Sequence, residues 1–254
     1  MAIWPRCNLN STCLPTVRSI SKSRSFSITS ATSNKLSTSV DDLRSDNPPS
    51  DSLPFEWLGH RPYEPTWELL QHRAAAVAAG VESEIIWACE HDPVYTTGRR
   101  AVDNRQQSTL PAPLIYTDRG GETTFHGNGQ VMLYPTVHLK RRKITPKQYV
   151  SRLEQSAINL LAGLGVSAER HCGLPGVWTN EGKIVAIGLR IQNGVAYHGM
   201  ALNVNVDATW FSAINPCGTG KKSVSLSDYI ERLDQIETIA ARWGEQLNLL
   251  LDGN

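Results

Sequence analysis

The sequence predicts an α/β fold, a single domain with a mixed, largely antiparallel sheet. Helical and strand-like patterns are interspersed over residues 55–254, several strand-like runs are joined by tight turns, and glycine and proline separate the runs. No internal repeat is evident. A chain of 254 residues is long enough to bury a full core. It contains no apolar run long enough to predict a membrane-spanning helix.

The first 40 residues differ from the rest in charge. They hold five of the 25 basic residues and none of the 24 acidic ones, so residues 41–254 carry a formal charge of −4. Arginine and serine without acidic residues are typical of an organelle transit peptide, and a disordered tail without a targeting role is the alternative. We expect a disordered transit peptide over residues 1–40 and a linker over residues 41–54. The RSFS stretch favours a mitochondrion, and the serine content also suits a plastid.

The five cysteines do not form a disulfide pattern. Cys7 and Cys13 lie in the predicted transit peptide, and the remaining Cys89, Cys172 and Cys217 are an odd number without a C-x-x-C pair. No cluster of cysteine and histidine has the spacing of a structural zinc site, so no metal is expected. Unpaired cysteines favour a reducing compartment. Cys89 lies in an apolar run and is expected to be a small core residue.

Three segments predict helices. The first is expected to begin at Thr66 and to end at Gly80. The second has Thr145 in the N-cap position and Pro146 in the first helical position. A third is expected within residues 227–251. In the second helix, apolar residues recur on one face: Tyr149, Val150, Leu153, Ala157, Leu160 and Leu161.

Strand-like runs occupy most of the remainder. Residues 83–98, SEIIWACEHDPVYTTG, are expected to form one apolar strand. Residues 113–139 are expected to form a strand, a glycine-rich loop and a second strand. Residues 176–206 contain the dipeptide Asn193-Gly194, a strong signal for a two-residue hairpin turn because both turn positions need positive φ.

A two-residue turn fixes the pairing in this hairpin. The predicted pairs are Gly188 with Gly199, Ala186 with Ala201 and Lys183 with Val204. The first two pairs form one area almost without side chains, which we call the small-residue patch. Such a patch weakens strands and is expected where another chain lies close against the sheet, with a tightly packed helix as the alternative. By strict alternation, Lys183 and His198 point to the opposite face, unless a bulge changes their direction.

Two glycine-rich segments do not qualify as phosphate-binding loops. HGNGQVM ends in Met132 where a dinucleotide loop needs glycine. NPCGTGKKS has Asn215 where a Walker loop needs glycine and Lys222 where it needs serine or threonine. The basic stretch at residues 140–143 is too short to predict nucleic-acid binding, and it is either a solvated loop or a surface for an acidic carrier.

Cys217 lies between Pro216 and Gly218, among loop-forming residues. A cysteine attacks as the thiolate, so a catalytic role requires a pKa below the ordinary value of about 8.5. A nearby cation lowers the pKa by stabilising the charged form. Lys183 opens an apolar strand, where its ammonium would be only partly solvated. The candidate cations are Lys183, Lys221, Lys222, His126 and His198. Residue types alone leave open whether Cys217 is a nucleophile.

Four segments occur in a recognisable order: RGGETTFHGNGQ (119–130), GVWTNEGKIVAIGLRI (176–191), YHGMALNVNVD (197–207) and INPCG (214–218). Together they closely resemble the lipoyl(octanoyl) transferases, which start protein lipoylation. HDPVYTTG (91–98) also resembles an early strand of that family, and the resemblance covers roughly residues 55–230. It implies a catalytic domain over residues 55–254 with the fold of the biotin and lipoate protein ligases.

The resemblance implies a ping-pong acyl transfer. Octanoyl-acyl carrier protein would deliver its thioester to a cysteine, and a lysine of a lipoyl domain would then attack to form an amide. The implied acceptors are the lipoyl domains of 2-oxoacid dehydrogenases and the glycine cleavage H protein. Cys217 matches the nucleophile of the family and Lys183 matches its activating partner. No cofactor is implied, because a thioester is already activated.

Substrate-binding residues are implied in three segments. They are Arg119, Gly120, Gly121, Glu122, Thr123, Thr124, Phe125 and His126 in the first, Ala186, Ile187 and Gly188 in the second, and Gly199, Met200 and Ala201 in the third. The last two segments contain the small-residue patch, with the acyl chain as its expected occupant. Asn128 stands where the family usually has proline in HGPGQ, which predicts a looser loop.

Three other functions compete with this interpretation. An ATP-dependent lipoate or biotin ligase of the same fold would need an adenylate-binding motif and would not require Cys217. A thioesterase would use water in place of the lysine acceptor, and no residue of the sequence stands out as its general base. A non-catalytic carrier-binding module is disfavoured by the presence of both Cys217 and Lys183.

Overall fold

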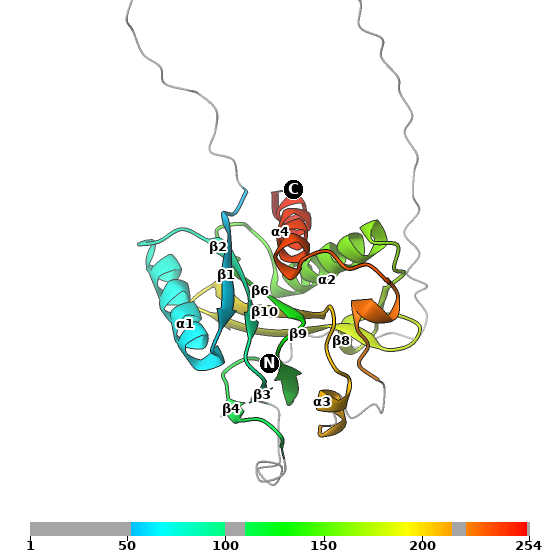
Figure 1. The fold of residues 1–254 in the computed structure, drawn as a ribbon. Helices are drawn as coiled ribbons and strands as arrows, with labels where there is room; N and C mark the ends of the chain where they lie inside the picture. The colour runs from blue at the N-terminus through cyan, green and yellow to red at the C-terminus, as the bar shows by residue number, and fades with distance from the viewer. Residues whose placement is uncertain (1–51, 100–109, 215–221, 253–254) are drawn as a thin grey trace, which may run out of the picture. The chain divides into compact units, whose positions relative to one another are not determined.

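The computed structural model describes residues 52–99, 110–214 and 222–252, which build two sheets and the helices around them (Figure 1). The larger sheet has seven strands in the order β1-β2-β6-β10-β9-β8-β7. In that order they are Phe55–Arg61, Ile85–His91, Gln130–His138, Val195–Asn203, Lys183–Gln192, Leu174–Trp178 and Glu169–His171. Strands β1 and β2 are parallel and the other neighbours are antiparallel, so the sheet is mixed and largely antiparallel, as predicted.

A second, three-stranded sheet has the order β4-β3-β5. Its strands are Leu114–Tyr116, Val94–Thr97 and Thr124–His126. The single strand expected over residues 83–98 is therefore wrong, because the chain leaves the large sheet after His91 and enters the small one at Val94. Pro93 lies between them and cannot donate a ladder hydrogen bond. Strand β5 also interrupts the segment that was expected to be a glycine-rich loop.

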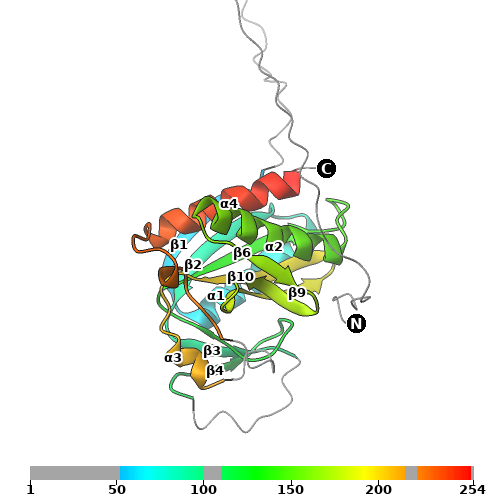
Figure 2. The same cartoon turned by 90° about the vertical axis from the view of Figure 1, so that its right-hand side faces the viewer.

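Helices cover both faces of the large sheet (Figure 2). α2 (Pro146–Gly163) and α4 (Ile236–Asp252) pack side by side on one face, and α1 (Tyr63–Ala79) lies on the other. The main core lies under α2 and α4, where the indole of Trp243 is fully buried and donates to the hydroxyl of Ser156 at 3.1 Å. Two short helical segments, α3 (Thr209–Ser212) and η2 (Leu226–Asp228), precede α4.

The ends of the helices follow the local sequence signals. Thr145 accepts a hydrogen bond from the backbone of Gln148 in a capping box, with Pro146 in the first turn, as predicted. All six residues of the predicted apolar face of α2 are buried. α1 ends where expected, since Gly80 adopts φ 76° as its C-cap. It begins three residues earlier than expected, because a proline in the first turn, Pro65, costs no helical hydrogen bond.

The β9–β10 hairpin has the predicted turn, with φ 51° at Asn193 and 82° at Gly194. The ladder confirms both pairs of the small-residue patch. The predicted pairing of Lys183 with Val204 is wrong: the ladder ends before it, and Lys183 forms an isolated parallel bridge with Ser223. The start of β9 is therefore held by the segment that leads into η2.

The segment that lies against the small-residue patch belongs to the same chain. Residues 117–123, which connect β4 to β5 and which we call the Arg119 loop, cross over it. A Cβ added at Gly188 would lie 3.0 Å from Cδ of Arg119 and 3.3 Å from the carbonyl oxygen of Gly120. The backbone of Gly120 donates to the carbonyl of Leu189 at 2.8 Å. Gly188 thus leaves room for the close approach of this loop, and among the described residues it is the loop, not a helix, that lies against the patch.

The burial and pairing of the described cysteines agree only partly with expectation. Cys89 is a free, fully buried thiol, as predicted. Cys172 is disulfide-bonded, so the expectation of unpaired cysteines is wrong for this residue, and the inference of a reducing compartment no longer follows from it. Cys7, Cys13 and Cys217 lie outside the described residues, as do the predicted transit peptide and most of the predicted linker.

The basic stretch at residues 140–143 is partly structural. Arg142 donates to Glu84 at 2.8 Å and lies 3.7 Å from the carboxylate of Asp252, which ties the loop after β6 to α4. The other three basic side chains are exposed. Over the described part of the chain, no helix is both long and apolar enough to cross a membrane.

Replacing Gly199 by alanine is expected to destabilise the fold. The new Cβ would overlap the carbonyl oxygen of Leu133 on the neighbouring strand, and backbone cannot move aside as a flexible side chain can. We expect a loss of about 1–3 kcal/mol in the free energy of unfolding, measured by urea denaturation. Gly163→Ala is the control, because a Cβ there meets nothing within 4 Å. Equal stability of the two variants would contradict this packing argument.

Candidate functional site

A cavity of about 170 Å³ lies between the Arg119 loop, the start of α1 and strands β6, β9 and β10. Thirteen of the substrate-binding and catalytic residues named from the sequence line it. They are Arg119, Gly121, Glu122, Thr123, Thr124, His126, Lys183, Ala186, Ile187, Gly188, Gly199, Met200 and Ala201. Segments far apart in the sequence therefore meet around one cavity.

Two residues of the predicted set lie elsewhere, and a third is not among the described residues. Gly120 is used in the backbone bond to Leu189 that holds the Arg119 loop on β9. The ring of Phe125 stacks on Trp210 with centroids 4.7 Å apart, in a small core beside the three-stranded sheet. Cys217 lies outside the described residues.

The cavity also contains residues that the motifs did not assign to substrate binding. They are Tyr63, Gln130, Met132, Tyr134, Gly173, Leu174, Pro175, His198, Asn203, Phe211 and Ser223. Gln130 and Asn203 carried a signal, because each is a polar residue inside an otherwise apolar strand. No feature of the sequence indicated that Tyr63 belongs to the site, because Tyr63 was expected to precede the first helix rather than to lie within it.

Lys183 and His198 share the cavity with the small-residue patch, although strict alternation placed them on the other face. His198 adopts φ 59°, which is rare for a residue other than glycine and which redirects its side chain. Lys183 is the first residue of β9 and pairs with Trp178 beside an irregularity in the ladder with β8. Its ammonium lies 4.6 Å from the centroid of the Trp178 ring, a cation–π contact.

Arg119 is a buried cation held mainly by oxygen atoms of the backbone. Its guanidinium donates to the carbonyl and hydroxyl oxygens of Thr96 and to the carbonyls of Gly120 and Glu122, at 2.6–3.2 Å. Among the described residues, no carboxylate forms an ion pair with it. Burial lowers the pKa of Arg119, but a guanidinium stays charged in proteins. The Arg119 loop is therefore ordered around its own buried charge.

His126 is fixed as a neutral ring by its partners. The amide nitrogen of Gln130 donates to Asn203 at 2.8 Å, so the amide oxygen of Gln130 accepts from Nδ1 of His126 at 2.8 Å. Nε2 of His126 must then accept from the hydroxyl of Thr96, at 3.1 Å. Burial and the charge of Arg119 lower the pKa of His126 to about 3. His126 therefore shapes the cavity wall and does not carry protons near neutral pH.

The hydrogen bonds that join Arg119, Thr96, His126, Gln130 and Asn203 continue toward the strand that carries Lys183. The amide nitrogen of Asn203 donates to the carbonyl of Val224 at 3.0 Å. The backbone of Val224 in turn donates to the carbonyl of Lys183 at 3.0 Å. A single run of hydrogen bonds thus joins Arg119 on one side of the cavity to Lys183 on the other.

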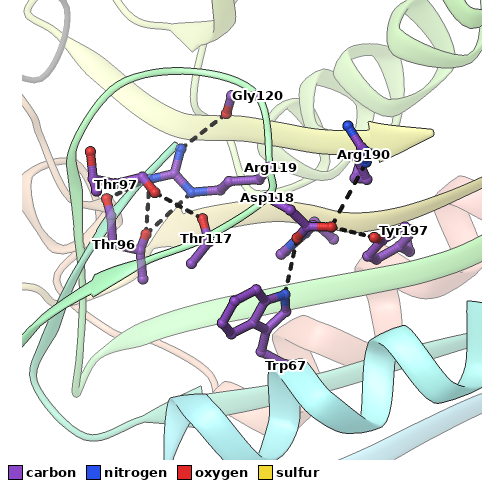
Figure 3. A network of polar contacts seen from close by, with 10 residues as sticks. Trp67, Thr96, Thr97, Thr117, Asp118, Arg119, Gly120, Arg190 and Tyr197 are labelled. Carbon is purple, nitrogen blue, oxygen red and sulfur yellow. Dashed lines mark hydrogen bonds and ion pairs between the residues drawn. The ribbon is translucent and has the colours of Figure 1, made fainter. Parts of the chain in front are cut away.

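Asp118 anchors the Arg119 loop to three other elements, as Figure 3 shows for Trp67, Tyr197 and Arg190. Its carboxylate accepts from the Trp67 indole at 3.0 Å, from Nε2 of His198 at 2.8 Å and from the Tyr197 hydroxyl, and it lies 3.8 Å from Arg190. Burial alone would raise the pKa of Asp118, but the bonds from His198, Tyr197 and Trp67 outweigh it and hold the pKa well below its usual range. The carboxylate is therefore ionised at neutral pH.

His198 has a defined tautomer for the same reason. An ionised carboxylate only accepts, so Nε2 of His198 carries the hydrogen that Asp118 accepts. Burial lowers the pKa of His198 in spite of the nearby carboxylate, so the ring is neutral at pH 7. Its Nδ1 is then a lone-pair acceptor.

Comparison with solved structures shows the fold. A bipartite lipoate protein ligase from Thermoplasma acidophilum superposes with a TM-score of 0.59 at 16% identity, covering 79% of this chain and 84% of that one. Biotin protein ligase from Aquifex aeolicus, in complex with biotin and ATP, gives a TM-score of 0.52 at 12% identity, covering 78% of this chain and 70% of that one. The mixed α/β fold is thus that of the lipoate and biotin protein ligases.

Sequence comparison shows the family. Residues 62–248 match the family described as the lipoyl protein ligase A/B catalytic domain. Octanoyltransferase from Dechloromonas aromatica is 44% identical over 192 residues, which cover 75% of this chain and 91% of that protein. Octanoyltransferase from Thiobacillus denitrificans is 45% identical over 170 residues, covering 67% and 78%. The chain therefore belongs to the lipoyl protein ligase A/B catalytic domain family and, within it, to the octanoyltransferases, which are acyltransferases.

Proposed function

We propose that the chain transfers an octanoyl group from octanoyl-acyl carrier protein to a lysine of lipoyl domains through a thioester on Cys217. This is the first step of protein lipoylation from endogenous octanoate. The observation that carries the proposal is the cavity in which Lys183 and the small-residue patch share one lining. An apolar acyl group and a cationic partner for a thiolate can occupy that space together.

The cavity suits an unbranched acyl chain. The short side chains of Ala186 and Ala201 leave room in the cavity beside the Arg119 loop, and the side chains of Met132 and Met200 supply flexible apolar walls. The Arg119 loop closes this space from the other side. Burying an acyl chain here gains about 0.8 kcal/mol for each methylene removed from water.

Lys183 is proposed to activate the nucleophile. A fall of two units in the pKa of Cys217 would need about 2.7 kcal/mol of preferential stabilisation of the thiolate. A partly buried ammonium can supply this, whereas a solvated one cannot. The half-buried position of Lys183 against the Trp178 ring supports that role.

The two half-reactions balance with Lys183 as the proton carrier. The Cys217 thiolate attacks the thioester carbon of the donor, the donor C–S bond breaks, and the departing carrier thiolate takes a proton from the Lys183 ammonium. The acceptor amine then attacks the new thioester, loses a proton to Lys183 and forms the amide as the Cys217 thiolate leaves. The starting forms of both residues are restored.

The partners and the location follow the same reasoning. The proposed acceptors are lipoyl domains of 2-oxoacid dehydrogenases and the glycine cleavage H protein. The proposed location is the mitochondrion, with a plastid as the alternative, because residues 1–40 have the composition of a transit peptide. A fluorescent protein fused to residues 1–54 would distinguish the two organelles, and diffuse fluorescence would contradict both.

Intact-protein mass spectrometry tests the acyl-enzyme. Mixed with octanoyl-acyl carrier protein without ATP, the protein is expected to gain one octanoyl group that hydroxylamine removes and an added lipoyl domain accepts. Cys217→Ser is expected to lose this labile adduct. If the parent stays unmodified while free octanoate with ATP modifies the lipoyl domain, the protein is a ligase. Release of free octanoate in place of transfer would indicate a thioesterase.

Removing the proposed activating cation tests Lys183. In Lys183→Ala, the pKa of Cys217 is expected to rise toward about 8.5. The rate of octanoyl transfer is expected to fall by about 10²- to 10⁴-fold. Alkylation of Cys217 by iodoacetamide at a series of pH values, followed by peptide mass spectrometry, measures the pKa. Lys147→Ala, at an exposed position in the first turn of α2, is the control. An unchanged alkylation profile in Lys183→Ala would exclude thiolate stabilisation by Lys183.

A further inference from the structure

We propose that Asn203 is a positioning residue of the transfer reaction, which holds residues 222–224 in register with Lys183 and thereby limits where Cys217 can lie. The side chain of Asn203 lines the cavity, and the motifs assigned it no role. The inference rests on the proposed function, because it concerns how the nucleophile and its activating cation are kept together.

Residues 222–224 are bound to the first residue of β9 itself. The backbone of Lys183 donates to the carbonyl of Lys222 at 2.9 Å, and the backbone of Val224 donates to the carbonyl of Lys183 at 3.0 Å. Ser223, between them, forms the parallel bridge with Lys183 and lines the cavity. Because this bridge is isolated, no continuing ladder of the described strands supports it.

Asn203 ties the same segment to a second strand. It is the last residue of β10, and its side-chain nitrogen donates to the carbonyl of Val224 at 3.0 Å in a buried hydrogen bond. Removing the donor would leave this carbonyl unpaired in a buried place, which is costly. The end of β10 and the start of β9 are therefore joined through Val224.

The amide of Asn203 satisfies this carbonyl in one orientation only. Its oxygen accepts from the side-chain nitrogen of Gln130 at 2.8 Å. Turning the amide over would place its oxygen against the carbonyl of Val224, and two acceptors cannot bond. Both Asn203 and Gln130 are buried, so water does not readily take the place of either partner. Asn203 is thus fixed between a buried side chain and the segment that it positions.

The separation between Lys183 and Cys217 depends on where this segment is held. Cys217 precedes Lys222 by five residues in the sequence. Five extended residues span at most about 18 Å, so the position of residues 222–224 limits the positions open to Cys217. The attraction between an ammonium and a thiolate falls in inverse proportion to their separation. A misplacement of about 1 Å can slow an enzymatic reaction by about 100-fold.

Asn203→Leu tests the positioning role, because it removes both hydrogen bonds of the amide and keeps a similar volume. We expect kcat for octanoyl transfer to fall by about 10- to 100-fold, while KM for octanoyl-acyl carrier protein changes by less than about threefold. The pH midpoint for alkylation of Cys217 by iodoacetamide is expected to rise by about half a unit, because the thiolate is stabilised less well. A merely structural role would reduce the amount of folded protein and leave this midpoint unchanged.

Gln130→Met is the matched comparison, since it also replaces a buried amide of the cavity wall by an apolar side chain of similar size. The side chain of Gln130 bonds to His126, Phe125 and Asn203, and the bond from Asn203 to Val224 does not involve it. The alkylation midpoint of Gln130→Met is therefore expected to stay close to that of the parent.

Two further variants guard against effects of stability. Ser156→Ala removes a buried hydroxyl that donates to the carbonyl of Leu153 and accepts from the Trp243 indole, in the core under α4. It is expected to lower stability and to leave kcat and the midpoint unchanged. If Asn203→Leu does not fold, Asn203→Ser replaces it. The serine hydroxyl ends about 1 Å short of both partners and adds no bulk, so the same changes in kcat and the midpoint are expected.

The outcomes separate this inference from the function on which it rests. A parent protein that transfers no octanoyl group from the carrier overturns both. A parent that transfers octanoyl groups, with a kcat and a midpoint that the Asn203 variants leave unchanged, overturns the positioning role alone. Equal shifts of the midpoint in Asn203→Leu and Gln130→Met also overturn it, because they would reflect general loosening of the cavity wall. A fall in kcat with a shifted midpoint, confined to the Asn203 variants, establishes the positioning role.

Discussion

The buried guanidinium of Arg119 is the constraint on which the rest of the site depends. A buried charge is tolerated only where its donors are used, and here most acceptors are carbonyl oxygens of its own loop and of Thr96. Satisfying them folds the Arg119 loop onto β9, where glycine at position 188 leaves room for it. After burial itself, the same charge contributes to lowering the pKa of His126 and of His198. One cation thus closes the cavity and helps to keep both histidines neutral.

Short sequence signals predicted the parts of the fold that depend on a few adjacent residues. The cap at Thr145 and the hairpin turn at Asn193 each depend on a few adjacent residues, and both form as expected. The break between β2 and β3 and the new partner of Lys183 depend on segments distant in sequence. The direction of His198 depends on one backbone angle in an otherwise regular strand, which alternation cannot anticipate.

The candidate site was likewise predictable only where it depends on residues contiguous in sequence. Motifs contiguous in sequence named the Arg119 loop and the two segments of the small-residue patch, and these meet in one cavity. Tyr63 and Tyr134 could not be named, because each enters through the packing of a separate element, α1 or β6. Gln130 and Asn203 were predictable in part. A polar residue in an apolar strand indicates that its side chain has a hydrogen-bond partner, but the sequence does not identify that partner.

The run of hydrogen bonds from Arg119 to Val224 has a fixed direction. A guanidinium can only donate and a carbonyl can only accept, so the two ends dictate the orientation of Thr96, His126, Gln130 and Asn203 between them. Proton conduction along such a run would require every member to reverse, and the two side-chain amides cannot pass a proton on. This run of hydrogen bonds therefore cannot conduct protons, and the protons that we propose Lys183 exchanges must arrive and leave with the substrates or through solvent.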